Sequence, residues 1–236
     1  MALAGEKLGV RTIVFTPASA PATKRAAIVA HGAELRDQAP DYDTAERWAR
    51  EYAAGGAAVF ISPYNHPDVI AGAGTVALEI LESAPATDVV VVPIGGGGLA
   101  AGIAVAMNHA GSRARVIGVE VEASTPFATG LARGAITEIS VRPSLADGLI
   151  GNLEPGAVTF EYVRDHVGRL VSVSEESLRA AVRGLAEEEH LIAEGAGAAA
   201  TAAVLARDVV APNERAVVLV TGGNIDLARF REVVAD

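Results

Sequence analysis

Residues 89 to 99 read Val-Val-Val-Val-Pro-Ile-Gly-Gly-Gly-Gly-Leu, and this stretch decides the fold of the chain. The apolar run predicts a buried strand over 88–94, and the small residues after the glycines predict a helix over 99–110. Glycines let the backbone turn sharply and present successive N–H groups to one point. The helix start adds free donors and the positive end of its dipole. Strand, loop and helix in this order predict a phosphate site, with a plain glycine turn as the alternative.

The amino-acid composition limits the classes of protein to which this chain could belong. The chain has 236 residues, is 50% hydrophobic and carries a net charge of −10, so a large core is expected and binding to nucleic acid or an anionic membrane is not. Cysteine is absent, which excludes disulfides and thiolate chemistry. The uncharged stretch 89–107 is interrupted by Pro93 and glycines, which favours a buried strand and helix over a membrane span. Glu6 and Lys7 argue against a signal peptide, so we expect a cytoplasmic protein.

Strands and helices alternate along nearly the whole sequence, which predicts an α/β fold with an open, mostly parallel sheet and helices on both faces. The predicted strands are 12–16, 33–36, 58–61, 88–94, 115–121, 169–173 and 216–221. The predicted helices are 22–31, 44–54, 69–83, 99–110, 175–189, 197–207 and 227–234.

A domain boundary is expected near the Gly55-Gly56 pair. It would leave part of a smaller α/β domain over 1–56 and a large ligand-binding domain over 57–236. The Pro- and Gly-rich stretch 142–156 predicts a long loop beside the site. Residues 1–8 look like the middle of a helix, so a missing upstream portion is expected.

Three elements follow predicted strands, where open α/β sheets bind ligands. They are the four glycines, Glu120, and the segment Thr221-Gly222-Gly223-Asn224. A ring-bearing phosphate would place its phosphate on the glycines and a ring heteroatom near Thr221. A turn hydroxyl is the alternative for Thr221.

A nicotinamide-dependent oxidoreductase is also compatible with the spacing. Gly95, Gly97 and Ala100 fit the pattern G-x-G-x-x-A, and Glu120 would then hold a ribose hydroxyl. Elsewhere, Glu194 precedes an alanine-rich helix, and Tyr64, Asn65 and His66 follow the predicted strand 58–61. The five histidines have no metal-binding spacing, and nothing marks a serine nucleophile.

With these residues identified, the chain resembles the fold-type II pyridoxal-phosphate enzymes, which are similar in fold to the tryptophan synthase β subunit, and specifically the threonine/serine dehydratase and serine racemase family. The resemblance covers nearly the whole chain. Its landmarks, in family order, are Lys7-Leu8-Gly9-Val10, Gly32-Ala33-Glu34, Val69-Ile70-Ala71-Gly72-Ala73-Gly74-Thr75, the segment 93–99, Gly118-Val119-Glu120, Ala146-Asp147-Gly148 and Thr221-Gly222-Gly223-Asn224.

The resemblance implies roles for individual residues. Gly95, Gly96, Gly97, Gly98 and Leu99 would bind the phosphate of pyridoxal phosphate, and Thr221 would face its pyridine nitrogen. Glu194 would belong to the cofactor site, with Tyr64, Asn65, Asp147 and Gly148 lining the pocket. The implied reaction converts a β-hydroxy amino acid such as threonine or serine to a 2-oxo acid and ammonia. A homodimer is implied for the full-length family.

The chain departs from the family in two respects. It has only two lysines, Lys7 and Lys24, and neither lies in a Lys-x-Arg-Gly-Ala segment like the one that supplies the family's Schiff-base lysine. The Ser-x-Gly-Asn substrate loop is absent as well. The chain alone is therefore expected to be inactive, and a ligand-binding remnant without catalysis is a further hypothesis. Glu120 could serve a divalent cation, but Pro126 stands where cation-binding members carry an acid.

Overall fold

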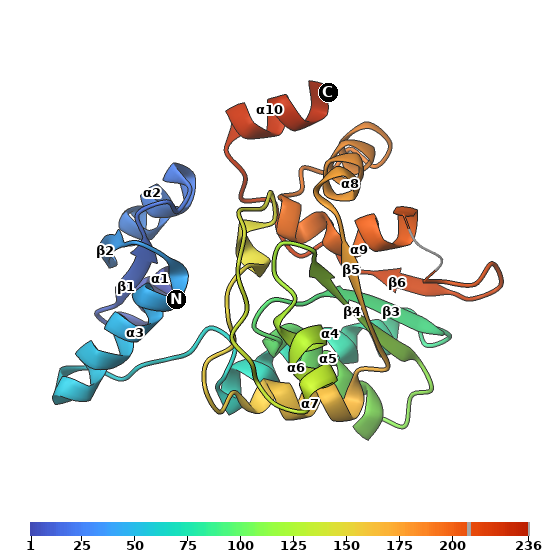
Figure 1. The fold of residues 1–236 in the computed structure, drawn as a ribbon, viewed down its shortest axis with the longest axis horizontal. Coiled ribbons are helices and arrows are strands. Elements are labelled where there is room, and N and C mark those ends of the chain that lie inside the picture. Colours follow the sequence, from blue (N-terminus) through green and yellow to red (C-terminus); the bar gives the residue numbers. More distant parts are fainter. Residues whose placement is uncertain (207–208, 236) are drawn as a thin grey trace. The chain divides into compact units, whose positions relative to one another are not determined.

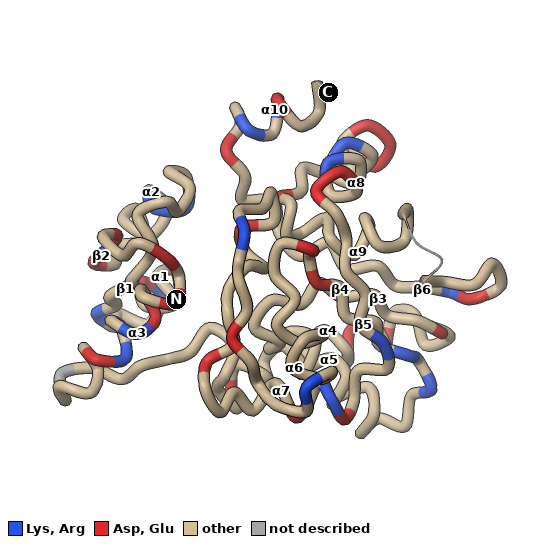
Figure 2. The backbone as a smooth tube through the Cα atoms, in the orientation of Figure 1, with Lys and Arg blue, Asp and Glu red and all other residues tan. Residues whose placement is uncertain are grey.

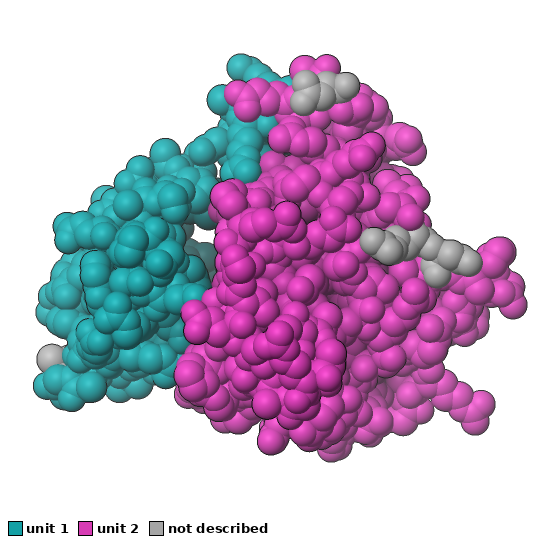
Figure 3. All heavy atoms as spheres, viewed as in Figure 1, with its two compact units in different colours: residues 1–61, 224–231 teal, residues 62–223, 232–236 magenta. Residues whose placement is uncertain are grey.

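The computed structural model describes residues 1–206 and 209–235, which form two compact units. Unit 1 contains Met1–Ile61 and Asn224–Arg231, and unit 2 contains Ser62–Gly223 and Glu232–Asp236 (Figure 3). The boundary expected from sequence, after residue 56, lies within the π-helical turn Ala53–Ala57, slightly before this division.

Unit 1 is built on two parallel strands, β1 (Ile13–Pro17) and β2 (Glu34–Ala39). Its helices are α1 (Ala2–Leu8), α2 (Ala22–Ala30) and α3 (Tyr42–Tyr52). Asp41 caps α3 by accepting a hydrogen bond of 2.7 Å from the Thr44 N–H. The strand expected over 58–61 is not formed. This stretch pairs with no strand among the described residues and Val59 is 86% exposed, so its apolar composition alone was misleading.

Unit 2 contains a four-stranded, all-parallel sheet in the order β5-β4-β3-β6. The strands are β3 (Val89–Pro93), β4 (Arg115–Val121), β5 (Arg169–Val173) and β6 (Ala216–Val218). The helices of this unit are α4 (Pro67–Ser83), α5 (Gly98–His109), α6 (Pro126–Arg133), α7 (Val158–His166), α8 (Glu175–Glu187) and α9 (Gly195–Ala206). The last helix, α10 (Leu227–Ala235), is divided between the units, since unit 1 includes its residues up to Arg231 and unit 2 those from Glu232.

Helices cover both faces of this sheet. Figure 1 shows α4, α5 and α7 on one side and α8 and α9 on the other. The predicted fold class, an open parallel α/β sheet between helices, is therefore confirmed. No helix in the described part of the chain is long and apolar enough to cross a membrane.

Strand β3 lies at the centre of the core. Val89, Val90, Val91 and Val92 are all fully buried, which explains the uninterrupted apolar run. Val91 is level with Ile117 of β4 and with Val218 of β6. Because the three strands are parallel and in register, their carboxyl ends meet at one edge of the sheet.

Helices α4 and α5 pack with direct backbone contact. A Cβ atom on Gly102 of α5 would lie 2.3 Å from the Ile70 carbonyl oxygen and 2.7 Å from the Gly74 nitrogen of α4. Glycine is required here because no side chain fits between the two helices.

Several boundaries differ from those predicted. Strand β6 ends at Val218, so Thr221 lies in the loop beyond it and not at its last position. One further hydrogen bond, from the Leu219 N–H to the Val91 carbonyl oxygen at 3.1 Å, follows the last paired residue of β6. Helices α6 and α7 were not predicted. Of the helix predicted over 197–207, Arg207 lies outside the described residues.

Candidate functional site

The glycine loop joins the central strand to the start of α5. Gly97 adopts φ 86°, a left-handed conformation that glycine tolerates, and it caps the helix. The first α-helical bond here runs from the Ala101 N–H to the Gly97 carbonyl oxygen at 2.8 Å. Within residues 1–206 and 209–235, the amides of Gly95 to Leu99 have no hydrogen-bond acceptor. The loop therefore offers a row of N–H donors at a helix N-terminus, which suits an anion.

Side chains pack against the loop where Cβ atoms would otherwise be. A Cβ on Gly96 would lie 2.3 Å from the Tyr64 ring, and one on Gly97 would lie 2.5 Å from Phe127. A Cβ on Gly98 would lie 3.0 Å from the Tyr64 Cα. The glycines are thus needed to let the loop lie flat against these neighbours, while Gly96 itself stays partly exposed.

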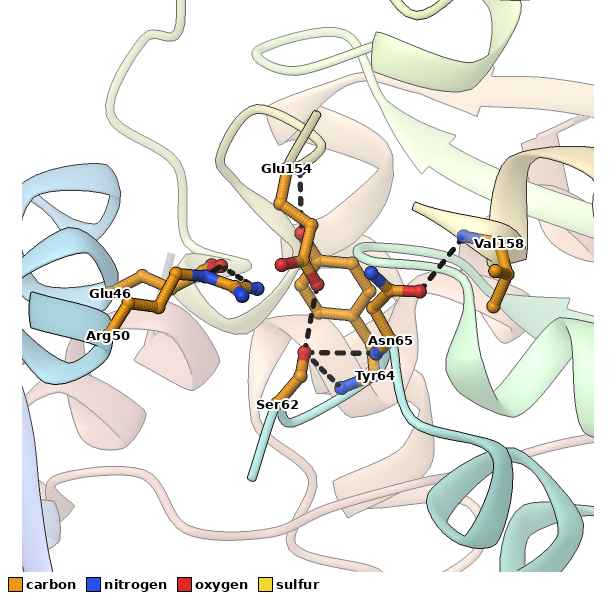
Figure 4. A network of polar contacts seen from close by, with 7 residues as sticks. All are labelled: Glu46, Arg50, Ser62, Tyr64, Asn65, Glu154 and Val158. Carbon is orange, nitrogen blue, oxygen red and sulfur yellow. Dashed lines mark hydrogen bonds and ion pairs between the residues drawn. The ribbon is translucent and has the colours of Figure 1, made fainter. Parts of the chain in front are cut away.

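A network of polar contacts surrounds Tyr64, whose ring lies against the glycine loop (Figure 4). Its hydroxyl accepts a hydrogen bond of 2.8 Å from the Glu154 N–H, and the Ser62 hydroxyl donates one of 3.0 Å to the Glu154 carboxylate. The Asn65 side-chain oxygen accepts a hydrogen bond of 2.9 Å from the Val158 N–H at the start of α7. Tyr64 therefore supports the glycine loop from below, and the Asn65 side chain is directed to α7.

The short 3-10 helix Asp147–Leu149 lies directly beside the first glycine. A Cβ on Gly95 would lie 3.1 Å from the Leu149 Cα and 3.3 Å from the Gly148 carbonyl oxygen. A Cβ on Gly148 would in turn lie 3.3 Å from the Cβ of Ala196 in α9. The segment containing Asp147 and Gly148 thus links the glycine loop to the start of α9.

The loop after β6 lies at the same edge of the sheet as the glycine loop. A Cβ on Gly197 would lie 2.2 Å from the Gly222 carbonyl oxygen, and one on Gly222 would lie 2.5 Å from Glu194 Oε1. The Glu194 N–H also donates to the Gly222 carbonyl oxygen at 3.0 Å. Thr221, the neighbour of Gly222, is exposed. The structure therefore brings Glu194 and the Thr221 loop together, next to the segment that contacts the glycine loop.

Charged side chains are absent from the two helices at this edge. Neither α5 nor α9 contains Lys, Arg, Asp or Glu (Figure 2). An anion in the glycine loop would consequently be bound by amides and by the α5 dipole, without a cationic side chain from these helices.

Glu120, the candidate cation or ribose ligand, is buried at the start of α6. It is 1% exposed, and its Oε1 and Oε2 accept hydrogen bonds of 2.8 and 3.0 Å from the Phe127 and Ala128 N–H groups. The carboxylate thus caps the N-terminus of α6. Burial raises the pKa of Glu120 to about 7, although the two amide donors favour the charged form. Among the described residues, no three His, Cys, Asp or Glu side chains gather as a metal site.

Two further residues contact the glycine loop, and the sequence pattern did not indicate either of them. The Thr159 hydroxyl donates a hydrogen bond of 2.8 Å to the Gly96 carbonyl oxygen, and Phe127 packs against Gly97. Both lie on the unpredicted helices α6 and α7. Pro126, at the first turn of α6, was the available signal for a helix start.

The model of the pyridoxal-phosphate-dependent enzyme family matches residues 1–222. The chain belongs to this family. It is 37% identical over 234 residues to an L-threonine ammonia-lyase of Thermotoga maritima, covering 99% of this chain and 58% of the relative. It is 39% identical over 228 residues to the catabolic L-threonine dehydratase of Escherichia coli, covering 96% of this chain and 69% of that protein.

The solved structures agree with this assignment. The processed form of threonine deaminase isoform 2 from Solanum lycopersicum superposes with a TM-score of 0.90 at 29% identity, covering 99% of this chain and 68% of the other. The chain covers 58% of the Thermotoga relative, which is less than two thirds of that protein's length. The family match does not support the alternative of a nicotinamide-dependent oxidoreductase, and the Glu120 oxygens are used by α6.

The described residues fit the phosphate of the family's cofactor. Five consecutive amides that have no acceptor among the described residues, at a glycine loop and a helix N-terminus, suit the negative charge of a phosphate ester. The family's lysine has no counterpart in unit 2, because residues 62–223 contain no lysine. Lys7 and Lys24 both belong to unit 1.

Proposed function

We propose that this chain binds pyridoxal phosphate and provides the cofactor-binding part of a threonine/serine ammonia-lyase. The observation that supports this most directly is the row of amides from Gly95 to Leu99 at the N-terminus of α5, for which the described part of the chain provides no acceptor. The relatives named as L-threonine ammonia-lyase and dehydratase suggest the substrate class, a β-hydroxy amino acid.

The residues of this chain would bind and orient the cofactor. The amides of the glycine loop would hold its phosphate, and Thr221 would face its ring nitrogen with a neutral hydroxyl. Glu194 would border the ring, and Asp147 and Gly148 would form the wall between the phosphate and α9. When bound, the cofactor would supply the electron sink for bond breaking at the substrate Cα.

Turnover in the family requires a lysine, and residues 62–223 of unit 2 contain none. A lysine acts in the family as the covalent anchor of the cofactor and as the base at the substrate Cα. We therefore expect the chain alone to bind pyridoxal phosphate without releasing ammonia. Homodimer formation and a cytoplasmic location are further parts of this proposal.

A fluorescence titration tests the proposal. Pyridoxal phosphate should bind saturably, inorganic phosphate should compete with it, and NAD should not bind. Saturable NAD binding without pyridoxal phosphate binding would contradict the proposal.

A second candidate is a ligand-binding remnant without catalysis, because Lys7 and Lys24, the two lysines of the given sequence, do not belong to the unit that carries the glycine loop. The N-terminal segment of a relative, supplied in trans with L-threonine, separates the two. Ammonia release would support the lyase, whereas cofactor binding without release would support the remnant.

A further inference from the structure

A buried threonine outside the glycine loop controls one of its peptide groups. Thr159 is the second residue of α7 and is completely buried. Its hydroxyl donates a hydrogen bond of 2.8 Å to the Gly96 carbonyl oxygen. This bond satisfies both a buried hydroxyl and a carbonyl oxygen of the loop.

The direction of the Gly96 carbonyl also sets the direction of the next amide. A trans peptide is planar, so its C=O and N–H point to opposite sides. Fixing the Gly96 oxygen on Thr159 therefore directs the Gly97 N–H away from α7. Gly97, at φ 86°, has no Cβ that would restrict this peptide, so the orientation depends on an outside contact.

Thr159 is itself held firmly in place. The Val158 N–H donates to the Asn65 side-chain oxygen at 2.9 Å, which anchors the first turn of α7. The rings of Phe127 and Phe160 stack with centroids 6.3 Å apart, which ties α6 to α7 under Gly97. The donor to Gly96 thus belongs to a rigid part of the core.

We propose that Thr159 is a positioning residue, which aims the Gly97 N–H at the phosphate of the ligand. This inference rests on the proposed function and extends it, because Thr159 would act without touching the ligand. Phosphate binding should therefore depend on the hydroxyl of Thr159 and not only on its volume.

The test compares two substitutions of the full chain by calorimetric titration with pyridoxal phosphate and, separately, with inorganic phosphate. Thr159→Val keeps the side-chain volume and removes the hydroxyl, and both affinities should fall roughly tenfold. Thr159→Ser keeps the hydroxyl and should bind within about threefold of the unmodified chain. Equal affinities for the valine variant and the unmodified chain would overturn the proposal.

A matched control separates positioning from loss of stability. Thr87 is half-buried and its hydroxyl donates to the Ala84 carbonyl oxygen at 2.7 Å, in the turn before β3 and so at the opposite end of that strand from the glycine loop. Thr87→Val should lower thermal stability without changing either affinity. A weakening equal to that of Thr159→Val would mean that Thr159 acts only through stability, against the proposal.

A measurement on the unmodified chain does not depend on how a variant folds. In an amide NMR titration with inorganic phosphate, the Gly97 cross-peak should be among those that shift most. Binding with an unmoved Gly97 peak would overturn this inference and leave the proposed function intact. Absence of any binding by the unmodified chain would overturn both.

Discussion

Gly197 of α9 lies so close to Gly222 that a Cβ atom on Gly197 would be 2.2 Å from the Gly222 carbonyl oxygen. The neighbour is backbone, so it cannot move aside by changing a rotamer. This contact places the start of α9 against the loop that carries Thr221.

Gly197→Ala should therefore shift the Thr221 loop. We expect it to lower the free energy of unfolding by about 1–3 kcal/mol and to weaken pyridoxal phosphate binding. Chemical denaturation and fluorescence titration measure the two effects. Gly184→Ala is the matched control, because nothing lies within 4 Å of a Cβ there and Gly184 is in the middle of α8. The control should gain about 0.5–1 kcal/mol of stability, and equal effects at both positions would contradict this prediction.

Gly96→Ala should disturb the phosphate site directly, because the new Cβ would lie 2.3 Å from the ring of the buried Tyr64. We expect the affinity for inorganic phosphate to fall by at least about tenfold, since the loop must move away from its position. Gly72→Ala in α4, where a Cβ meets nothing within 4 Å, should leave the affinity unchanged. Unaltered phosphate binding by Gly96→Ala would show that the loop is not the site.

Thr221→Ala should distinguish the two ends of the proposed ligand. The hydroxyl would contact the ring nitrogen and not the phosphate, so pyridoxal phosphate affinity should fall about threefold to tenfold. Inorganic phosphate should bind as before, and Thr221→Ser should restore the cofactor affinity. A parallel loss of both affinities would contradict the assigned role.

Glu120 should make stability depend on pH. Burial raises the pKa of Glu120 to about 7 from its ordinary value of 4.5, so between these values the folded chain holds a proton that the unfolded chain has released. The free energy of unfolding should fall as the pH rises through this window, by about 3 kcal/mol in total.

Glu120→Gln removes the titrating carboxyl group. The variant should therefore lack the fall in the free energy of unfolding that Glu120 causes as the pH rises. Urea unfolding of both chains at about pH 5.5 and about pH 8 measures the difference. The stability of the unmodified chain relative to the variant should be greater at the lower pH. Parallel pH profiles for the two chains would be inconsistent with the raised pKa.

The sequence predicted the elements whose signals are local. The bounds of β4 and β5 agree with the predictions, because their apolar runs are short and clearly bounded. The stretch 58–61 has a similar composition but pairs with no strand in the described part of the chain, and neighbours in space are not visible in a sequence. Residues before the four glycines and after them likewise predicted the loop and α5.

The sequence indicated the part of the candidate site that is built from backbone groups, the glycine loop. It did not indicate the parts that depend on contacts between residues far apart in the chain. Four consecutive glycines predict the loop, but nothing in the sequence shows that the Asn65 side chain accepts a hydrogen bond from the start of α7. Glu120 follows a strand as a ligand-binding acid would, yet its oxygens accept from amides that come later in the chain. Thr159 could not be found because α7 lacked a clear start signal and its partner lies 63 residues away.

The contact of Gly102 with Ile70 and Gly74 prevents α5 from sliding or rolling along its neighbour. The donors at the head of α5 consequently keep one arrangement in the free protein. The conformational entropy needed to align them would then be lost during folding and not on association, so an anion of the proposed kind would meet donors that are already arranged.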